Sequence, residues 1–366
     1  MKPLLACALS MCLLLAAGCS DSSPTSPGGS FLDGTANDPQ IGLVINSTGR
    51  ALTMFQLGDP AQSRQVPLGA SSSVTPVGLA IGGRRAAIPL GAAGSVAVVD
   101  LAGERIERFF TFPGGNATGS VFVDDSTVIA ANLVDDYVGR FTMGQASDQI
   151  TDTVSVAPAP ATVLTDGSQV YVISGNLDPS FAPLGNGVVT IIDPATMTVV
   201  DTIFSGGTNT QAAALGPDGL LYIVNTGDFV ADGSITVIDP AARAIVTTVP
   251  GFGPGPGAIS IDAAGLAYVS GFFTGTLVWS TVTRQFIRDV SDPVCARLTQ
   301  AAGTPCRGAF AATADRDGRL YQVFFGDSFQ GLPPAVFVYQ PGTFQLSDSL
   351  EAGVGPSSID VAVFGP

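Results

Sequence analysis

The chain has 366 residues, of which 46% are hydrophobic and only 12% are charged, and its net charge at pH 7 is −15. Lys2 is the only lysine, and the sequence contains no histidine. The acidic balance excludes nucleic-acid binding, because phosphate backbones require a basic surface. Because the chain has no histidine, a Ser-His-Asp triad and a Cys-His pair are excluded, and because it has no lysine after Lys2, a lysine Schiff base is excluded as well.

Residues 1–18 have the pattern of a secretory signal peptide. One basic residue precedes an apolar stretch of about 15 residues, and small residues lead up to Cys19. The segment LAAGC, residues 15–19, resembles a bacterial lipobox. That resemblance implies cleavage before Cys19, attachment of lipid to its thiol, and a firm membrane anchor, since each buried CH₂ contributes about 0.8 kcal/mol. The alternative is an ordinary signal peptide with a chance cysteine.

Residues 19–39 are rich in Ser, Pro, Gly and Asp, which predicts a lipidated, flexible tether. Ser20 rather than Asp follows Cys19. By analogy with enterobacterial sorting, this favours the outer membrane over the inner one, and the side of the membrane stays open. Residues 40–366 are predicted to form one folded domain.

From about residue 75 onward, a unit of four short strands recurs. The two clearest copies, which begin at Ala161 and Gln211, have an apolar strand, a tight turn, a Tyr-centred strand, a loop, a Val/Ile strand that ends in Asp, and a final Thr/Val strand. A repeat of about 40–50 residues with four strands is typical of a β-propeller blade. Six units open near Thr75, Ala117, Ala159, Thr210, Gly257 and Gly308.

The two ends of the chain supply the parts of one more unit. GPSSIDVAVF, residues 355–364, matches only a first strand, whereas three strands without a first one stand at residues 41–69. We therefore predict an all-β, seven-bladed β-propeller of four-stranded blades, closed by the C-terminal strand joining the N-terminal blade. Six and eight blades are the alternatives.

The irregular segments of this topology share one face of the ring. They join the second strand of a blade to the third, or one blade to the next, whereas the opposite face carries tight Asp-Gly and Asp-Pro turns. Long irregular loops are where function usually resides, so this loop face is the predicted functional face. Its segments are residues 113–120, 132–139, 174–187, 205–211, 225–233, 251–257 and 324–334.

Cys295 and Cys306 are the cysteines that follow the predicted lipid-attachment residue. In an exported protein an isolated pair predicts a disulfide. A zinc site is the weaker alternative, because two thiolates without histidine supply only half of a typical ligand shell.

Two pairs of segments resemble the YVTN β-propeller repeat, which is named for a Tyr-Val-Thr-Asn strand. These are YIVN and ITVIDP, at residues 222–225 and 235–240, and YVIS and VTIIDP, at residues 171–174 and 189–194. The resemblance is looser elsewhere. It implies an exported or surface propeller without established catalysis, in which the Tyr packs between blades and the Asp caps a turn.

Carboxylates are the remaining candidates for site chemistry. If they converge, they could bind Ca²⁺, form an acid/base pair, or dock a cationic partner. The alternative is that they are solvated turn residues of an acidic protein. The loop-face aspartates are Asp135, Asp136, Asp178, Asp228, Asp232 and Asp327.

Two aromatic runs suggest a ligand pocket, but packing of the core is the favoured interpretation. Their members are Phe272, Phe273, Trp279, Phe324, Phe325 and Phe329.

We therefore expect a monomeric, lipid-anchored propeller of the bacterial cell envelope that acts as a non-catalytic binding or scaffold module. It is expected to use no cofactor, apart from a possible Ca²⁺, and to meet an envelope protein or polymer on the loop face. The alternative is a Ca²⁺-dependent hydrolase or lactonase that uses the loop-face aspartates.

Overall fold

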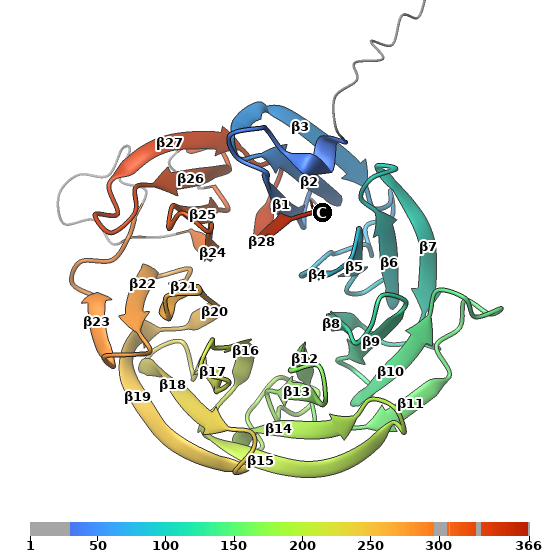
Figure 1. The fold of residues 1–366 in the computed structure, drawn as a ribbon. Coiled ribbons are helices and arrows are strands. Elements are labelled where there is room, and N and C mark those ends of the chain that lie inside the picture. The colour runs from blue at the N-terminus through green and yellow to red at the C-terminus, as the bar shows by residue number, and fades with distance from the viewer. Residues whose placement is uncertain (1–29, 296–305, 307, 327–330, 365–366) are drawn as a thin grey trace, which may run out of the picture.

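The chain forms a ring of four-stranded antiparallel sheets around a central axis (Figure 1). This computed structural model describes residues 30–295, 306, 308–326 and 331–364. The described residues form seven sheets, which we number as blades 1 to 7 in chain order. From the innermost to the outermost strand, blade 1 contains β28 (Pro356–Val363), β1 (Gln40–Asn46), β2 (Ala51–Gln56) and β3 (Asp59–Pro67), and blade 2 contains β4 (Ala80–Gly82), β5 (Arg85–Pro89), β6 (Ser95–Asp100) and β7 (Arg105–Thr111). In the same order, blade 3 contains β8 (Ala117–Phe122), β9 (Thr127–Asn132), β10 (Tyr137–Thr142) and β11 (Asp152–Ser155); blade 4 contains β12 (Pro160–Thr165), β13 (Val170–Ser174), β14 (Asn186–Asp193) and β15 (Thr198–Thr208); and blade 5 contains β16 (Thr210–Leu215), β17 (Leu221–Asn225), β18 (Asp232–Asp239) and β19 (Ala244–Pro254). Blade 6 contains β20 (Pro256–Ile261), β21 (Leu266–Gly271), β22 (Gly275–Ser280) and β23 (Gln285–Arg288), and blade 7 contains β24 (Ala309–Ala314), β25 (Leu320–Phe324), β26 (Ala335–Tyr339) and β27 (Leu346–Glu351).

The ring is closed by strands from the two ends of the chain. β28 pairs with β1 in antiparallel register, from Gln40 opposite Val363 to Ile45 opposite Ser358. The C-terminal strand is thus the innermost strand of blade 1, beside the axis in Figure 1. The predicted seven-bladed architecture and its closure are both confirmed.

The core lies between the blades rather than at the axis. Among the described residues it falls into seven apolar clusters, one in each gap between neighbouring blades. The middle strands β13 and β17 are buried along their whole length, whereas the outer strands β15 and β19 are largely exposed. Strands that pack on both faces need continuous apolar runs, which is why the second and third strands carry the Val/Ile-rich sequence.

The repeated tyrosines pack against the next blade, as the repeat implied. Tyr222 of blade 5, for example, meets Trp279 of blade 6 edge to face, with ring centroids 6.1 Å apart. The Asp that ends the third strand caps a turn, since Asp193 Oδ1 accepts hydrogen bonds from the backbone N–H groups of Ala195 (2.8 Å) and Thr196 (3.2 Å). Both expectations are confirmed.

The tyrosines also bind a second aspartate, in the turn that precedes them. Tyr171 donates its hydroxyl to Asp166 Oδ2 at 2.6 Å, and Tyr222 does the same to Asp218 at 2.6 Å. Burial raises the pKa of Asp166, but the hydrogen bonds from Tyr171 and from the turn outweigh it and lower the pKa to about 2. Each such bond fixes the hairpin between the first two strands, with Gly167 at φ 89° completing the turn of blade 4.

A short segment before β1 packs on the propeller. The 3₁₀ helix η1 (Phe31–Asp33) places the fully buried Leu32 in the cluster between blades 1 and 2. Gln56 Nε2 donates a hydrogen bond to the Phe31 carbonyl at 2.9 Å. The packed body therefore begins within the segment predicted as a tether. Residues 1–29, which include the predicted signal and Cys19, lie outside the described residues.

Cys295 and Cys306 form a disulfide, as predicted. The bridge joins the end of blade 6 to the start of blade 7, across a sequence separation of 11 residues.

Replacing both cysteines with alanine should lower the free energy of unfolding by about 2 to 3 kcal/mol, because the unfolded chain regains the entropy of an open loop. Urea denaturation of the oxidised protein measures the loss. A reductant should then destabilise the wild type by a similar amount and leave the variant unchanged. Equal stability of variant and oxidised wild type would contradict the prediction.

Within the part of the chain that the structure describes, no helix is long and apolar enough to cross a membrane.

Candidate binding site at the mouth of the central channel

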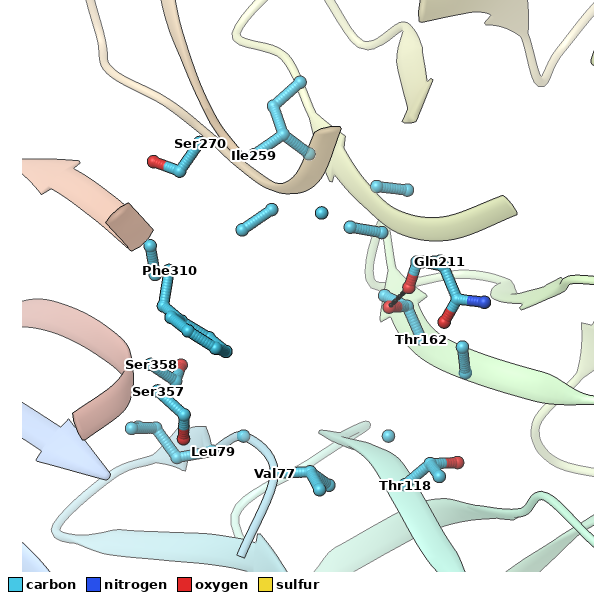
Figure 2. A pocket seen from close by; sticks show the side chains of 18 of the residues that line it. Val77, Leu79, Thr118, Thr162, Gln211, Ile259, Ser270, Phe310, Ser357 and Ser358 are labelled. Carbon is cyan, nitrogen blue, oxygen red and sulfur yellow. Dashed lines mark hydrogen bonds between the residues drawn. The ribbon is translucent and has the colours of Figure 1, made fainter. Parts of the chain in front are cut away.

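A cavity of about 880 Å³ occupies the centre of the ring on the loop face. The innermost strand of every blade contributes to its wall, as Thr118, Thr162 and Ile259 illustrate (Figure 2). The loop residues Ser47, Phe229 and Phe272 also line it. The sequence predicted the face but not the cavity, because the wall is formed by single short segments from seven distant parts of the chain.

One side of the cavity is aromatic. Phe310 of β24 stacks on Phe325 with ring centroids 4.8 Å apart, and Phe272 meets Phe310 edge to face at 5.6 Å. Phe310 lines the cavity (Figure 2). Phe272 lines it as well, and so does Phe229 from the loop between β17 and β18. Phe272 is 38% exposed and Phe229 is 54% exposed, so aromatic surface is available to a ligand.

The other side carries hydroxyl and amide groups, and three of them already donate hydrogen bonds to other parts of the protein. Thr118 Oγ1 donates to the Pro160 carbonyl at 2.8 Å, and Thr162 Oγ1 donates to the Gln211 carbonyl at 2.9 Å, each reaching the next blade (Figure 2). Gln211 Nε2 donates one of its two hydrogens to Asn209 Oδ1 at 2.5 Å. Lone pairs on Thr118 Oγ1, Thr162 Oγ1 and Gln211 Oε1 are therefore available to accept a hydrogen bond from a ligand.

Among the described residues, none that lines the cavity carries a charge. This differs sharply from the rest of the chain, where acidic residues outnumber basic ones by 30 to 15. The absence of a basic group in this lining makes the cavity unsuited to a carboxylate or phosphate ligand.

The predicted loop-face aspartates bind their own surroundings instead of one another. Asp135 Oδ2 accepts a hydrogen bond from Asn132 Nδ2 at 3.0 Å. Asp136 Oδ1 accepts one from the backbone N–H of Ala159 at 2.9 Å. Each of these two carboxylates therefore stabilises a nearby segment of the loop face through a hydrogen bond.

Two further loop-face aspartates organise their loops in the same way. Asp178 Oδ1 accepts from the N–H groups of Ser180 (2.8 Å) and Ala182 (2.9 Å) and from the Ser180 hydroxyl (2.7 Å). The hydrogen bonds from Ser180 and Ala182 hold its pKa below the usual range. Asp228 has a lowered pKa because backbone N–H groups, first that of Ala231, bind its carboxylate.

Asp232 begins β18, and Asp327 lies outside the described residues. Within the described residues, the structure does not bring Asp135, Asp136, Asp178, Asp228 or Asp232 into a group of three carboxylates close enough to share an ion.

A different group of acids does converge, on the opposite face. Carboxylate oxygens of Asp38, Asp315 and Asp317 lie within 4.8 Å of one another. The side chain of Arg319 enters this group, with Nε 2.5 Å from Asp315 Oδ2 and Nη2 bound to Asp38. Burial favours a raised pKa for Asp38, but hydrogen bonds from Gln40 and Arg319 outweigh it and lower the pKa. The guanidinium already occupies the position beside these carboxylates that a bound cation would take, so we assign the group a structural role.

The aromatic runs divide between core and site. Trp279 and Phe324 are buried in the core, as the favoured interpretation predicted. That interpretation is wrong for Phe272, which lines the cavity, and for Phe325, which backs Phe310 there. The sequence does not separate the two sets, because core and cavity phenylalanines are adjacent in the chain, as Phe324 and Phe325 are.

No protein-family model matches the sequence, and no curated protein matches it. The structure is similar to that of hydrazine synthase from Kuenenia stuttgartiensis, with a TM-score of 0.61 and 14% sequence identity. The similarity covers 79% of this chain and 90% of that chain. At this identity, the comparison shows the propeller fold alone, and a fold does not by itself determine a function.

Proposed function

We propose that this protein is a non-catalytic, lipid-anchored propeller of the bacterial cell envelope that binds a partner on its loop face. The observation that carries the proposal is the cavity at the channel mouth, to which all seven blades contribute and whose described lining has no titratable side chain. General acid–base and nucleophilic catalysis need such side chains at the reacting atoms. A binding role makes no such demand.

The hydrolase alternative receives less support. Calcium needs six to eight oxygen ligands around one point. Asp178 and Asp228, which the sequence offered for that role, bind the backbone of their own loops. The similarity to hydrazine synthase concerns the fold, and gives no reason to transfer that enzyme's reaction to this chain.

The position in the cell is proposed from the sequence. A lipid on Cys19 would hold the ring at the outer membrane as a monomer, with the packed body beginning about ten residues further on, near Leu32. The loop face also presents exposed apolar side chains such as Val230, which is 84% exposed. Exposed apolar groups beside a cavity are typical of surfaces that meet a partner.

In-cell photocrosslinking tests this function. A photoreactive residue replaces Val230 on the loop face in the full-length chain, and the control replaces Val282, which is 76% exposed in the turn between β22 and β23 on the opposite face. We expect the Val230 variant to yield a discrete crosslinked product that the Val282 variant lacks. Equal products, or none from either variant, would contradict binding at the loop face. The companion substitution Cys19→Ser should release the protein from the membrane fraction.

A further inference from the structure

The mouth of the channel is suited to a small molecule. Its volume of about 880 Å³ is within the range of sites for small ligands, roughly 300–1,000 Å³. Apart from a few hydroxyl and amide groups, the described lining is made of Gly, Ala and larger apolar side chains. Such a surface gains free energy when an apolar ligand displaces water from it.

The phenylalanines give the cavity a preferred ligand shape. Phe310 is held in place by stacking on Phe325 and by the edge of Phe272, so a ring that enters the cavity meets a preformed aromatic surface. Aromatic pairs gain about 0.5–1.5 kcal/mol beyond the area that they bury. A planar aromatic ligand uses this surface better than an alkyl chain does.

The polar wall offers acceptors for a ligand's hydrogen-bond donor. The hydroxyl hydrogens of Thr118 and Thr162 are bound to backbone carbonyls, and one of the two amide hydrogens of Gln211 is bound to Asn209. Their oxygen lone pairs remain for a ligand. A ligand that donates a hydrogen bond therefore finds several acceptors on this wall.

The absence of charged side chains from the described lining favours an uncharged ligand. No described residue of the lining can neutralise an anion or a cation, and burying an unpaired ion in an apolar site is costly. The acidic surroundings repel anions further.

We propose that the channel mouth is a binding site for a small uncharged aromatic molecule that carries a hydrogen-bond donor. The proposal rests on the proposed binding function and gives it a ligand class. The aromatic side formed by Phe310 holds the ring, and the acceptor wall around Thr162 and Gln211 receives the donor.

Two dyes that differ by one charged group test the proposal. N-phenyl-1-naphthylamine is uncharged and has one N–H donor, and 1-anilinonaphthalene-8-sulfonate is the same molecule with a sulfonate. Fluorescence titrations use the chain from residue 20 onward, which retains the whole closed ring and has no lipid to take up dye. We expect saturable binding of the uncharged dye at one site per chain, and at least tenfold weaker binding of the sulfonate.

Three variants locate the site. Phe310→Ala should weaken binding of the uncharged dye at least fivefold, whereas Phe204→Ala should not change it, because Phe204 is a 63% exposed ring on the outer strand β15. Ser358→Lys places a cation on the wall and should reverse the preference in favour of the sulfonate. In competition, 1-naphthol should displace the dye better than 1-methoxynaphthalene, although it is the less apolar of the two.

Equal affinity for both dyes, or binding that survives Phe310→Ala, would overturn the proposal. So would the absence of any saturable binding. In each of these cases a crosslink from position 230 would still support a partner on the loop face, so the two proposals fail separately.

Discussion

Arg319→Ala is expected to lower the free energy of unfolding by about 3 to 5 kcal/mol, because it removes the cation that is paired with two buried carboxylates. Asp315 is 4% exposed and Asp38 is 6% exposed, and Arg319 binds both. Gln40 adds a hydrogen bond from Nε2 to Asp38 Oδ1 at 2.8 Å. Asp38 and Gln40 lie at the start of blade 1, whereas Asp315 and Arg319 form the β24–β25 turn of blade 7. The group therefore ties together the two blades that meet where the ring closes.

Urea denaturation at pH 7 measures this loss, and Arg316→Ala is the matched control. Arg316 is three residues away and its side chain is 51% exposed, with Nε 3.9 Å from Asp317, so its loss should cost less than about 1 kcal/mol. The difference in the free energy of unfolding between Arg319→Ala and the wild type should also become smaller at acidic pH. The lowered pKa of Asp38 stabilises the wild type above pH 3.8, and this contribution disappears as pH falls through the folded-state pKa. Similar losses for the two arginine variants would contradict the assigned role.

The fold was predictable because its signals are local and repeated. The blades repeat a tight turn and apolar middle strands, with a Tyr in the second strand of blades 4 to 7. Counting strands at the two ends was enough to predict closure by β28. The tyrosine–aspartate bonds were within reach as well, since Asp166 precedes Tyr171 by only five residues.

The site was harder to predict from the sequence, because it depends on contacts between blades. The Thr162 hydroxyl binds the carbonyl of Gln211, 49 residues away, and Arg319 binds Asp38 across 281 residues. No pattern in the sequence indicates that the residues of either pair are in contact. The loop-face aspartates were visible in the sequence, but their carboxylates bind nearby groups, and only geometry reveals this. Phe310 escaped notice because it stands alone on its strand, outside both aromatic runs.

Asp360 is the second residue for which a large effect is expected, because a carboxyl group lies where other blades have apolar or neutral side chains. In β28, Ile359 packs in the cluster between blades 7 and 1, and Ala362 packs against the cluster between blades 1 and 2. Since alternate residues of a strand share a face, Asp360 lies on the side of Ala362. It is paired with Leu43 of β1, and the corresponding residue in blade 4 is Leu164, which is paired with Tyr171.

Burial raises the pKa of Asp360 to about 6, and the hydrogen bond from the Val361 N–H to its Oδ1, at 2.8 Å, opposes this only in part. The ordinary value is 3.8, so the folded protein holds this proton more tightly than the unfolded chain does. Stability from this group is therefore greatest below pH 3.8. It falls as pH rises toward 6 and is constant above that. At neutral pH the ionised carboxylate costs about 3 kcal/mol.

Asp360→Asn should accordingly stabilise the ring at pH 8 by about 2 to 3 kcal/mol, because the amide keeps the shape of the side chain and cannot ionise. The gain should shrink by about 2 kcal/mol at pH 4.5, where the wild-type carboxyl is already protonated in the folded state. Urea denaturation of both proteins at several pH values measures this difference. The contributions of the other acidic residues cancel, because these residues are the same in both proteins. Asp348→Asn, on the exposed strand β27, is the control and should show no such trend. A gain that did not vary with pH would mean that the charge of Asp360 is not what weakens the closing strand. The expected variation would identify this single carboxyl as a source of instability at the seam where the ring is closed.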